Sequence, residues 1–272
     1  MNFIAIFLVA LFLLGIIVGS FIAGRTQRIM HEVPTDPMGR SYCFSCKRTL
    51  SWWQMIPIIS QILLRRKCAY CKTPFSLFYM AVEASLGCIF LVSGLCFHFL
   101  ITPLDQLTFL TLGVLCFQLL ILSILFYASV LDLGIQAFPI AGILFVTALT
   151  VLARFLGFGY IEGIHGILGS IGFAGTLFAI QQVGKFILKK DVMGTGDICI
   201  ALLLGASLGI SGAIISFYIT MIMGAILSCM LLISKKVSRH SPLAFAPLLS
   251  LGGWITMYGG KFILDWYLSL LS

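Results

Sequence analysis

The sequence predicts an all-α bundle of membrane-spanning helices. Hydrophobic residues make up 60% of the chain and charged residues only 10%, whereas about a quarter of the residues in a typical soluble domain are charged. The mean hydropathy is +1.12. The apolar runs are continuous rather than alternating, which favours helices over barrel strands, the two structures that satisfy backbone hydrogen bonds in lipid. Most of the chain is therefore expected to lie in a membrane.

Eight apolar segments follow one another, and most are long enough to cross a hydrocarbon core of about 30 Å, which needs roughly 20 helical residues. The segments are residues 2–23, 77–100, 106–131, 137–156, 163–188, 197–210, 212–234 and 243–270. The sixth is short, and its boundary with the seventh is not sharply defined. No Lys or Arg precedes the first segment and no convincing cleavage site follows it, so we expect a retained helix rather than a signal peptide.

Basic residues are concentrated in three of the segments that separate the predicted spans. Residues 25–72 hold nine of the 17 Lys and Arg, and residues 185–190 and 235–239 hold three each. Eight crossings place these three segments on one side of the membrane, which the positive-inside rule makes cytoplasmic. Both termini are then expected outside. The net charge of +8 is explained by this topology and by contact with anionic lipid rather than by nucleic acid.

Four cysteines lie in the one sizeable polar segment, residues 24–76. They form two C-x-x-C pairs, Cys43 with Cys46 and Cys68 with Cys71, separated by 21 residues. Two pairs at this separation can bring four thiolates around one tetrahedral Zn²⁺, as in a zinc ribbon. With four ligands and no open position, such an ion would be structural. Redox exchange is the alternative, and disulfides are disfavoured in a reducing cytoplasm.

The cysteine segment divides the chain into three predicted parts. These are a first transmembrane helix (1–23), a cytoplasmic tetracysteine domain (24–76) and a membrane-embedded domain (77–272). The other five cysteines lie in apolar runs, where Cys usually behaves as a small hydrophobic residue.

Six of the nine acidic residues are assigned to loops, to outer turns or to the outer end of the last span, which leaves Glu83, Asp132 and Asp197 in the membrane-embedded part. A carboxylate there is costly unless it faces protein or water, and it commonly has a function. The topology places Asp132 and Asp197 at one depth near the inner surface, where they can face each other. Two facing carboxylates share one proton. In aspartic proteases one such group takes a proton from the attacking water while the other polarises the scissile carbonyl.

Asp197 follows Gly194-Thr195-Gly196, and the two glycines permit unusual backbone angles and a close approach of a substrate strand. Three alternatives remain open. Asp197 can simply cap a helix. The two aspartates can bind a proton or cation in a transporter, where they would lie near the midplane. The chain can also be an inactive membrane scaffold whose zinc loop recruits partners.

Further motifs occur in order along the chain. They are Gly19-Ser20-Phe21, the stretch Leu50-Ser51-Trp52-Trp53-Gln54-Met55-Ile56-Pro57-Ile58-Ile59-Ser60 between the cysteine pairs, Glu83, Asp132-Leu133 with Pro139 seven residues later, the GxGD motif ending at Asp197, and Phe245-Ala246-Pro247. The long stretch matches the pattern L-x-W-x-x-x-I-P-x-x-S. In these motifs and their order the chain resembles the type IV prepilin peptidases, also called prepilin leader peptidase/N-methyltransferases, over nearly its full length.

The resemblance implies that Asp132 and Asp197 are the catalytic pair of a GxGD-type membrane aspartyl protease in a bacterial inner or plasma membrane. The implied substrate is a prepilin or pseudopilin whose short basic leader stays in the cytoplasm. Many such enzymes also methylate the new N-terminus with S-adenosylmethionine. Glu83 is then a candidate for binding substrate or methyl donor, or equally an ion-pair partner of the basic loop.

The loop pattern is closest to enzymes of Gram-positive bacteria that process competence pseudopilins. Two positions depart from the family. Phe138-Pro139-Ile140 replaces the common Ile-Pro-Asp, and Cys199 replaces a common Lys. These changes alter the charge around the pair and remove neither proposed catalytic carboxylate.

Overall fold

The computed structural model describes residues 2–31, 41–103, 108–136, 138–189, 193–234 and 244–271. All regular elements in these ranges are helices, which confirms the all-α prediction. The described residues also contain two isolated antiparallel β-bridges, Tyr42 to Thr49 and Lys67 to Pro74. The basic segment 235–239 and the end of the segment 185–190 lie outside the described residues.

The chain forms two compact units, residues 1–119 and 120–272. The first contains α1 (Asn2–Met30), the 3₁₀ helix η1 (Trp52–Met55), α2 (Ile59–Leu63) and α3 (Leu77–Leu100). The helix α4 (Phe109–Ile135) begins in this unit and ends in the second. The second also contains α5 (Ile140–Phe158), α6 (Tyr160–Leu188), α7 (Thr195–Ile233) and α8 (Ala246–Leu271). The predicted three-part division of the chain stays a prediction, because these units describe packing alone.

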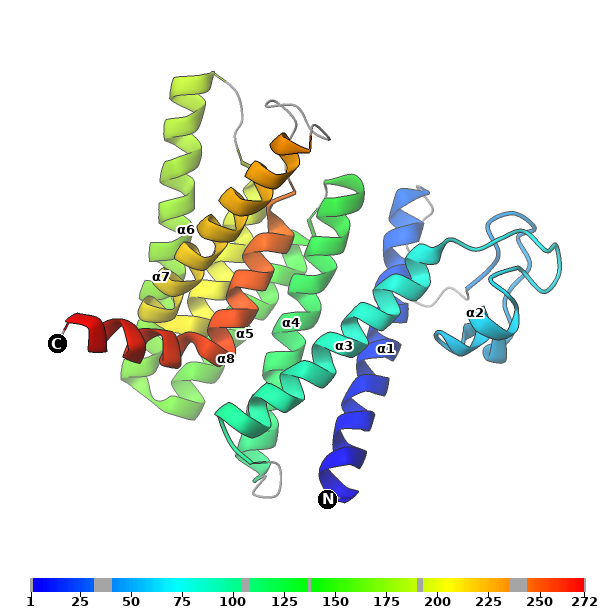
Figure 1. The fold of residues 1–272 in the computed structure, drawn as a ribbon, viewed down its shortest axis with the longest axis horizontal. Helices are drawn as coiled ribbons and strands as arrows, with labels where there is room; N and C mark the ends of the chain where they lie inside the picture. Colours follow the sequence, from blue (N-terminus) through cyan, green and yellow to red (C-terminus); the bar gives the residue numbers. More distant parts are fainter. Residues whose placement is uncertain are drawn as a thin grey trace. The chain divides into compact units, whose positions relative to one another are not determined.

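Glycines allow α1 and α3 to approach each other closely in the first unit (Figure 1). A Cβ atom added at Gly15 would lie 2.7 Å from the carbonyl oxygen of Leu86, and one at Gly19 would lie 2.9 Å from Glu83 Cα. Small residues at such positions are typical of helix pairs in membranes. The contact at Gly19 places the end of α1 directly against the backbone of Glu83.

Gly209 breaks α7 into two arms, residues 195–208 and 210–233. Its φ of 71° and ψ of −171° are not helical, and such a conformation favours glycine. The Arg154 guanidinium lies at this break, where it donates to the Ser207 carbonyl (2.9 Å) and pairs with the Glu162 carboxylate (2.6 Å). Arg154 therefore satisfies a carbonyl that the end of the first arm leaves without a helical partner.

The second arm of α7 runs back along the first. A Cβ atom added at Gly252 would lie 3.2 Å from the Ser216 carbonyl oxygen, and one at the adjacent Gly253 would lie 3.0 Å from Leu204 Cδ1. A straight helix would separate Leu204 from Ser216 by about 18 Å along its axis. Both residues contact neighbouring glycines of α8, so the chain must reverse between them (Figure 1).

Six of the described helices are long and apolar enough to cross a membrane: α1, α3, α4, α5, α6 and α7. The chain is therefore a multi-pass membrane protein, but the predicted number of eight spans is not confirmed. One difference is that α7 contains both the sixth and the seventh predicted segment. The other is that α8, which carries Lys261 and Asp265, is not among the six.

Two helices extend beyond their predicted ends. The first continues to Met30 instead of ending at residue 23, and α4 continues to Ile135 instead of residue 131. Hydropathy marks where apolar surface ends, whereas a helix can continue beyond it. Asp132 consequently lies within the last turn of α4 and not after it.

Candidate active site, pocket and metal centre

The two cysteine pairs lie in turns with the same backbone geometry. The Lys47 N–H donates to the Cys43 carbonyl (2.8 Å), and the Lys72 N–H donates to the Cys68 carbonyl (3.0 Å). Lys47 and Lys72 have φ angles of 59° and 60°. Each C-x-x-C sequence thus forms a similar tight turn, which presents its two sulfurs on one side.

The four sulfurs of Cys43, Cys46, Cys68 and Cys71 all lie within 4.8 Å of one another. The Sγ atoms of Cys43 and Cys71 are 3.8 Å apart. Zn–S bonds of about 2.3 Å in a tetrahedron give S···S separations of about 3.8 Å. The cluster predicted from the sequence is therefore present as a group that can hold one metal ion.

Cys71 is exposed and shares a hydrogen bond with the Thr73 hydroxyl (3.2 Å). The side-chain and backbone hydrogen bonds with Thr73 lower the pKa of the Cys71 thiol to about 6, whereas the pKa of the neighbouring Cys46 thiol is raised to about 11. Cys43 and Cys68 are buried, which protects half of the cluster from solvent.

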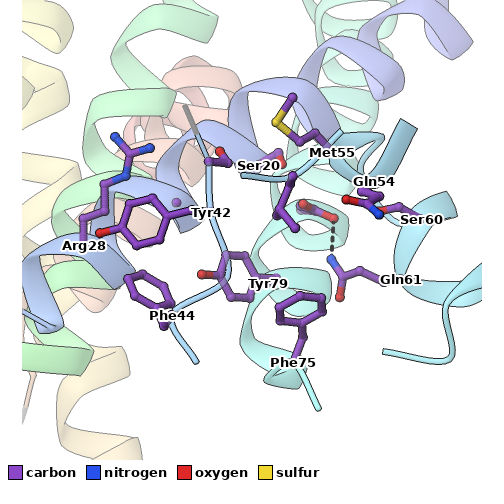
Figure 2. Close-up of a pocket in the computed structure, with 14 residues that line it drawn as sticks. Ser20, Arg28, Tyr42, Phe44, Gln54, Met55, Ser60, Gln61, Phe75 and Tyr79 are labelled. Carbon is purple, nitrogen blue, oxygen red and sulfur yellow. Dashed lines mark hydrogen bonds between the residues drawn. The ribbon is translucent and has the colours of Figure 1, made fainter. Parts of the chain in front are cut away.

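A pocket of about 130 Å³ lies in the first unit between α1, α3 and the segment that carries η1 and α2 (Figure 2). Its walls combine aromatic rings with charged and polar groups. They include Arg28, Tyr42, Phe44, Gln61, Tyr79 and Glu83. Figure 2 shows the rings of Tyr42 and Phe44 beside Arg28, and the rings of Tyr79 and Phe75 between them and Gln61.

Glu83 is 2% exposed and is held by neutral partners. It accepts hydrogen bonds from the Ile58 N–H (2.8 Å), from Gln61 Nε2 (3.1 Å) and from the Ser20 hydroxyl. The other end of the Gln61 amide, Oε1, is buried and has no hydrogen-bond partner among the described residues. The amide of Gln61, a residue of the pocket wall, therefore has one end held by Glu83 and the other end without a described partner.

Ile58 adopts a strained backbone conformation. Its φ is 58° and its ψ is −55°, values that a β-branched residue rarely adopts. The Ile59 N–H donates to the Pro57 carbonyl (2.5 Å), so residues 57–59 form a tight γ-turn, a rare and strained arrangement. The hydrogen bond from Ile58 to Glu83 holds this turn in place.

Asp132 and Asp197 come from α4 and α7 and are 8% and 5% exposed. Asp132 is close enough to Asp197 for its charge to act on it. Asp132 Oδ2 accepts a hydrogen bond from the Ala246 N–H (3.2 Å) at the start of α8. Asp197 Oδ1 is buried without a hydrogen-bond partner among the described residues. Both acids that the sequence singled out are therefore buried. Asp132 has a backbone hydrogen bond, Asp197 has one oxygen without a described partner, and their catalytic roles stay a prediction.

The unusual backbone angles expected at Gly194 and Gly196 are not found, whereas the close approach of a substrate strand stays a prediction. Gly194 is extended (φ −74°, ψ 151°), and the described glycines with positive φ are Gly159 and Gly209. Unusual backbone angles are therefore not the reason for glycine here. A Cβ atom at Gly196 would overlap the ring of Phe138, so glycine at this position leaves space for that ring.

Three site features were not predicted from the sequence. The Phe245-Ala246-Pro247 motif does not predict the hydrogen bond from the Ala246 N–H to Asp132, because nearly every residue type has a backbone N–H. The γ-turn at Ile58 was equally invisible. Phe138 did carry a signal, since it is a departure from the family pattern, but that departure was interpreted only as a change of charge.

Residues 13–97 match the family model described as the bacterial peptidase A24 N-terminal domain. A prepilin leader peptidase/N-methyltransferase of Bacillus subtilis is 26% identical to this chain over 96% of it and 97% of the relative. The resemblance to the prepilin peptidases is confirmed. A Neisseria gonorrhoeae protein of the same name is 26% identical over 94% of this chain and 93% of the relative. A third, from Legionella pneumophila, is 29% identical over 84% and 75%. No solved structure matches the chain significantly.

Proposed function

We propose that this chain is a membrane aspartyl endopeptidase that removes the basic leader of type IV prepilins or pseudopilins at the cytoplasmic face. The observation that carries the proposal is the burial of Asp132 and Asp197 side by side, in a chain similar along 96% of its length to a prepilin leader peptidase. The Bacillus subtilis relative favours a competence pseudopilin as substrate.

The site supports a mechanism in which water attacks the scissile carbonyl. The Ala246 N–H fixes one oxygen of Asp132, which orients the carboxyl and leaves its other oxygen for the water. Asp197 Oδ1 has no described partner and can contact the same water or the carbonyl. The ionised aspartate takes a proton from the attacking water as its oxygen bonds to the carbonyl carbon, while the protonated aspartate donates a hydrogen bond to the carbonyl oxygen. A proton held by the pair then goes to the nitrogen of the leaving amine as the C–N bond breaks.

The test is cleavage of a candidate prepilin in membranes by the native chain, by Asp132→Asn and by Asp197→Asn. Each substitution keeps the shape and removes the titrating group, so each should lower kcat by at least about 1,000-fold. Asp265→Asn is the matched control, because Asp265 is an exposed acid on α8. Full activity of both site variants would refute the proposal. It would leave the alternatives of a transporter and a scaffold.

We also propose that the chain methylates the new N-terminus, as the names of the relatives indicate for those proteins. The walls of the pocket in the first unit offer groups that suit parts of S-adenosylmethionine, which is larger than the pocket's volume of about 130 Å³ and would extend beyond it. Tyr42 and Phe44 offer faces for a purine, Arg28 offers a partner for a carboxylate, and Gln61 Oε1 is a buried acceptor for an ammonium group. The bound donor would supply the methyl group, and the pocket residues would bind and orient it next to Glu83.

Gln61→Leu tests this assignment, because it keeps side-chain bulk and removes the acceptor. It should weaken S-adenosylmethionine binding by about tenfold, the value of one hydrogen bond to a charged group, while cleavage of the leader continues. Binding is measured directly by calorimetry, without a pilin. Gln182→Leu, at an exposed position on α6, is the control. Unchanged binding by Gln61→Leu would exclude this pocket as the methyl-donor site.

For the tetracysteine cluster we propose a structural Zn²⁺. The four-sulfur donor set and the S···S distances suit this ion, and four protein ligands leave no position for catalysis.

A further inference from the structure

Phe138 connects the two elements that carry the aspartates. It follows Asp132 by six residues in the chain. Its ring lies against Gly196, the residue before Asp197, so closely that a Cβ atom there would overlap three ring carbons. A Cβ atom at Gly194 would lie 3.9 Å from Phe138 Cε2 and 3.7 Å from Asp197 Oδ2. The ring therefore packs on the turn that presents Asp197.

The position of the ring is fixed by its surroundings. The Phe138 carbonyl accepts a hydrogen bond from the Ile140 N–H (2.9 Å) at the start of α5. Pro139 follows directly and restricts the backbone of Phe138 to extended conformations. The Ile143 N–H donates to the Pro139 carbonyl (3.0 Å). The first turn of α5 therefore holds the backbone of Phe138, and the contact with Gly196 places its ring.

The contact with the Phe138 ring requires a residue without a side chain at position 196. The backbone of Gly196 is not among the described positive-φ positions, so an alanine could adopt the same angles. What an alanine could not do is keep the turn in contact with Phe138, because its methyl group would occupy the volume of the ring. The need for glycine at this position therefore arises from the aromatic ring and not from the conformation of the chain.

We propose that Phe138 is a positioning residue for the aspartate pair, which sets the separation of Asp132 and Asp197 through its contact with Gly196. This inference rests on the proposed peptidase function. Phe138 holds the Asp197 turn against the segment that follows Asp132. A larger residue at position 196 pushes the turn away, and a smaller one at position 138 lets it move.

A double-mutant cycle with Phe138→Ala and Gly196→Ala tests the contact. Gly196→Ala alone should lower kcat by about 100-fold, the cost of a displacement of roughly 1 Å at a catalytic group. In the Phe138→Ala background the same change should cost less than about threefold, because the clash is gone. Phe138→Leu, which keeps most of the bulk, should retain more activity than Phe138→Ala. The matched controls are Phe145→Ala, at a position 70% exposed on α5, and Gly175→Ala, which has no atom within 4 Å of the added Cβ.

The pH profile of kcat separates positioning from a general loss of folding. Two carboxylates share their proton according to their separation, so Phe138→Ala should move at least one limb of the profile by about 0.5 pH unit or more with little change in KM. Equal losses from Gly196→Ala in both backgrounds, or an unchanged profile in Phe138→Ala, would overturn the proposal.

The same cycle measured on thermal unfolding of the purified protein needs no pilin. In one outcome, the effects on unfolding are non-additive while no version, the native chain included, cleaves a pilin. That result confirms the contact between Phe138 and Gly196 and rejects both the peptidase function and the positioning role. Additive unfolding rejects the contact itself. The two failures are therefore distinguishable.

Discussion

The Glu83 carboxylate accepts hydrogen bonds from two other parts of the first unit, which a residue that only binds a ligand does not need. This carboxylate holds the strained turn at Ile58 and one end of the Gln61 amide, and the α1 backbone passes next to Glu83 at Gly19. Backbone strain of this kind persists only where the surroundings enforce it. We therefore expect Glu83 to act on the pocket through Gln61 and the Ile58 turn.

Substitution of Glu83 distinguishes its role as a hydrogen-bond acceptor from a role for its negative charge. Glu83→Gln keeps an acceptor oxygen for the Ile58 N–H and should change the free energy of unfolding by less than about 1 kcal/mol. Glu83→Ala removes the acceptor, leaves a buried N–H unpaired and should destabilise the protein by about 2–3 kcal/mol. Chemical unfolding of the purified protein in detergent measures both. Equal destabilisation by the two variants would show that the charge matters and the acceptor does not.

The elements show where sequence patterns were informative and where they were not. Hydropathy located the helices within a few residues, and the C-x-x-C spacing identified the sulfur cluster, because both signals are encoded locally. The reversal at Gly209 was missed, since an apolar run looks the same whether it continues or turns back. The contact of Phe138 with Gly196 depends on tertiary packing between distant parts of the chain, which no local pattern describes.

The tetracysteine element should depend on its metal. Within residues 41–76 the regular elements are the short helices η1 and α2, so a bound ion would contribute much of the folding free energy of this part. Purified protein should contain about one zinc per chain, and removal of zinc by a chelator should make residues 41–76 sensitive to protease. Cys68→Ser should behave like the chelated protein, whereas Cys88→Ser, at an exposed position in α3, should not. Protease resistance without any metal would contradict this prediction.

At the scale of the whole molecule, the sidedness predicted from the basic residues remains to be measured. Both termini are predicted outside, because the positive-inside rule assigns the lysine- and arginine-rich segments to the cytoplasm. Epitope tags at the two ends of the full chain should be removed by protease added to intact spheroplasts. A tag inserted in the tetracysteine segment should survive until the membrane is permeabilised. Protection of one terminal tag alone would contradict an even number of crossings, and protection of both would contradict the predicted orientation.

The first arm of α7 is shorter than the hydrocarbon core of a membrane. It contains about 14 residues before Gly209 and spans roughly 21 Å, whereas a hydrocarbon core is about 30 Å thick. No residue from Gly196 to Gly209 is exposed, so this arm packs against protein rather than lipid. A helix too short to cross the bilayer by itself is thus accommodated without contact with acyl chains, and Asp197, near its start, lies in protein surroundings.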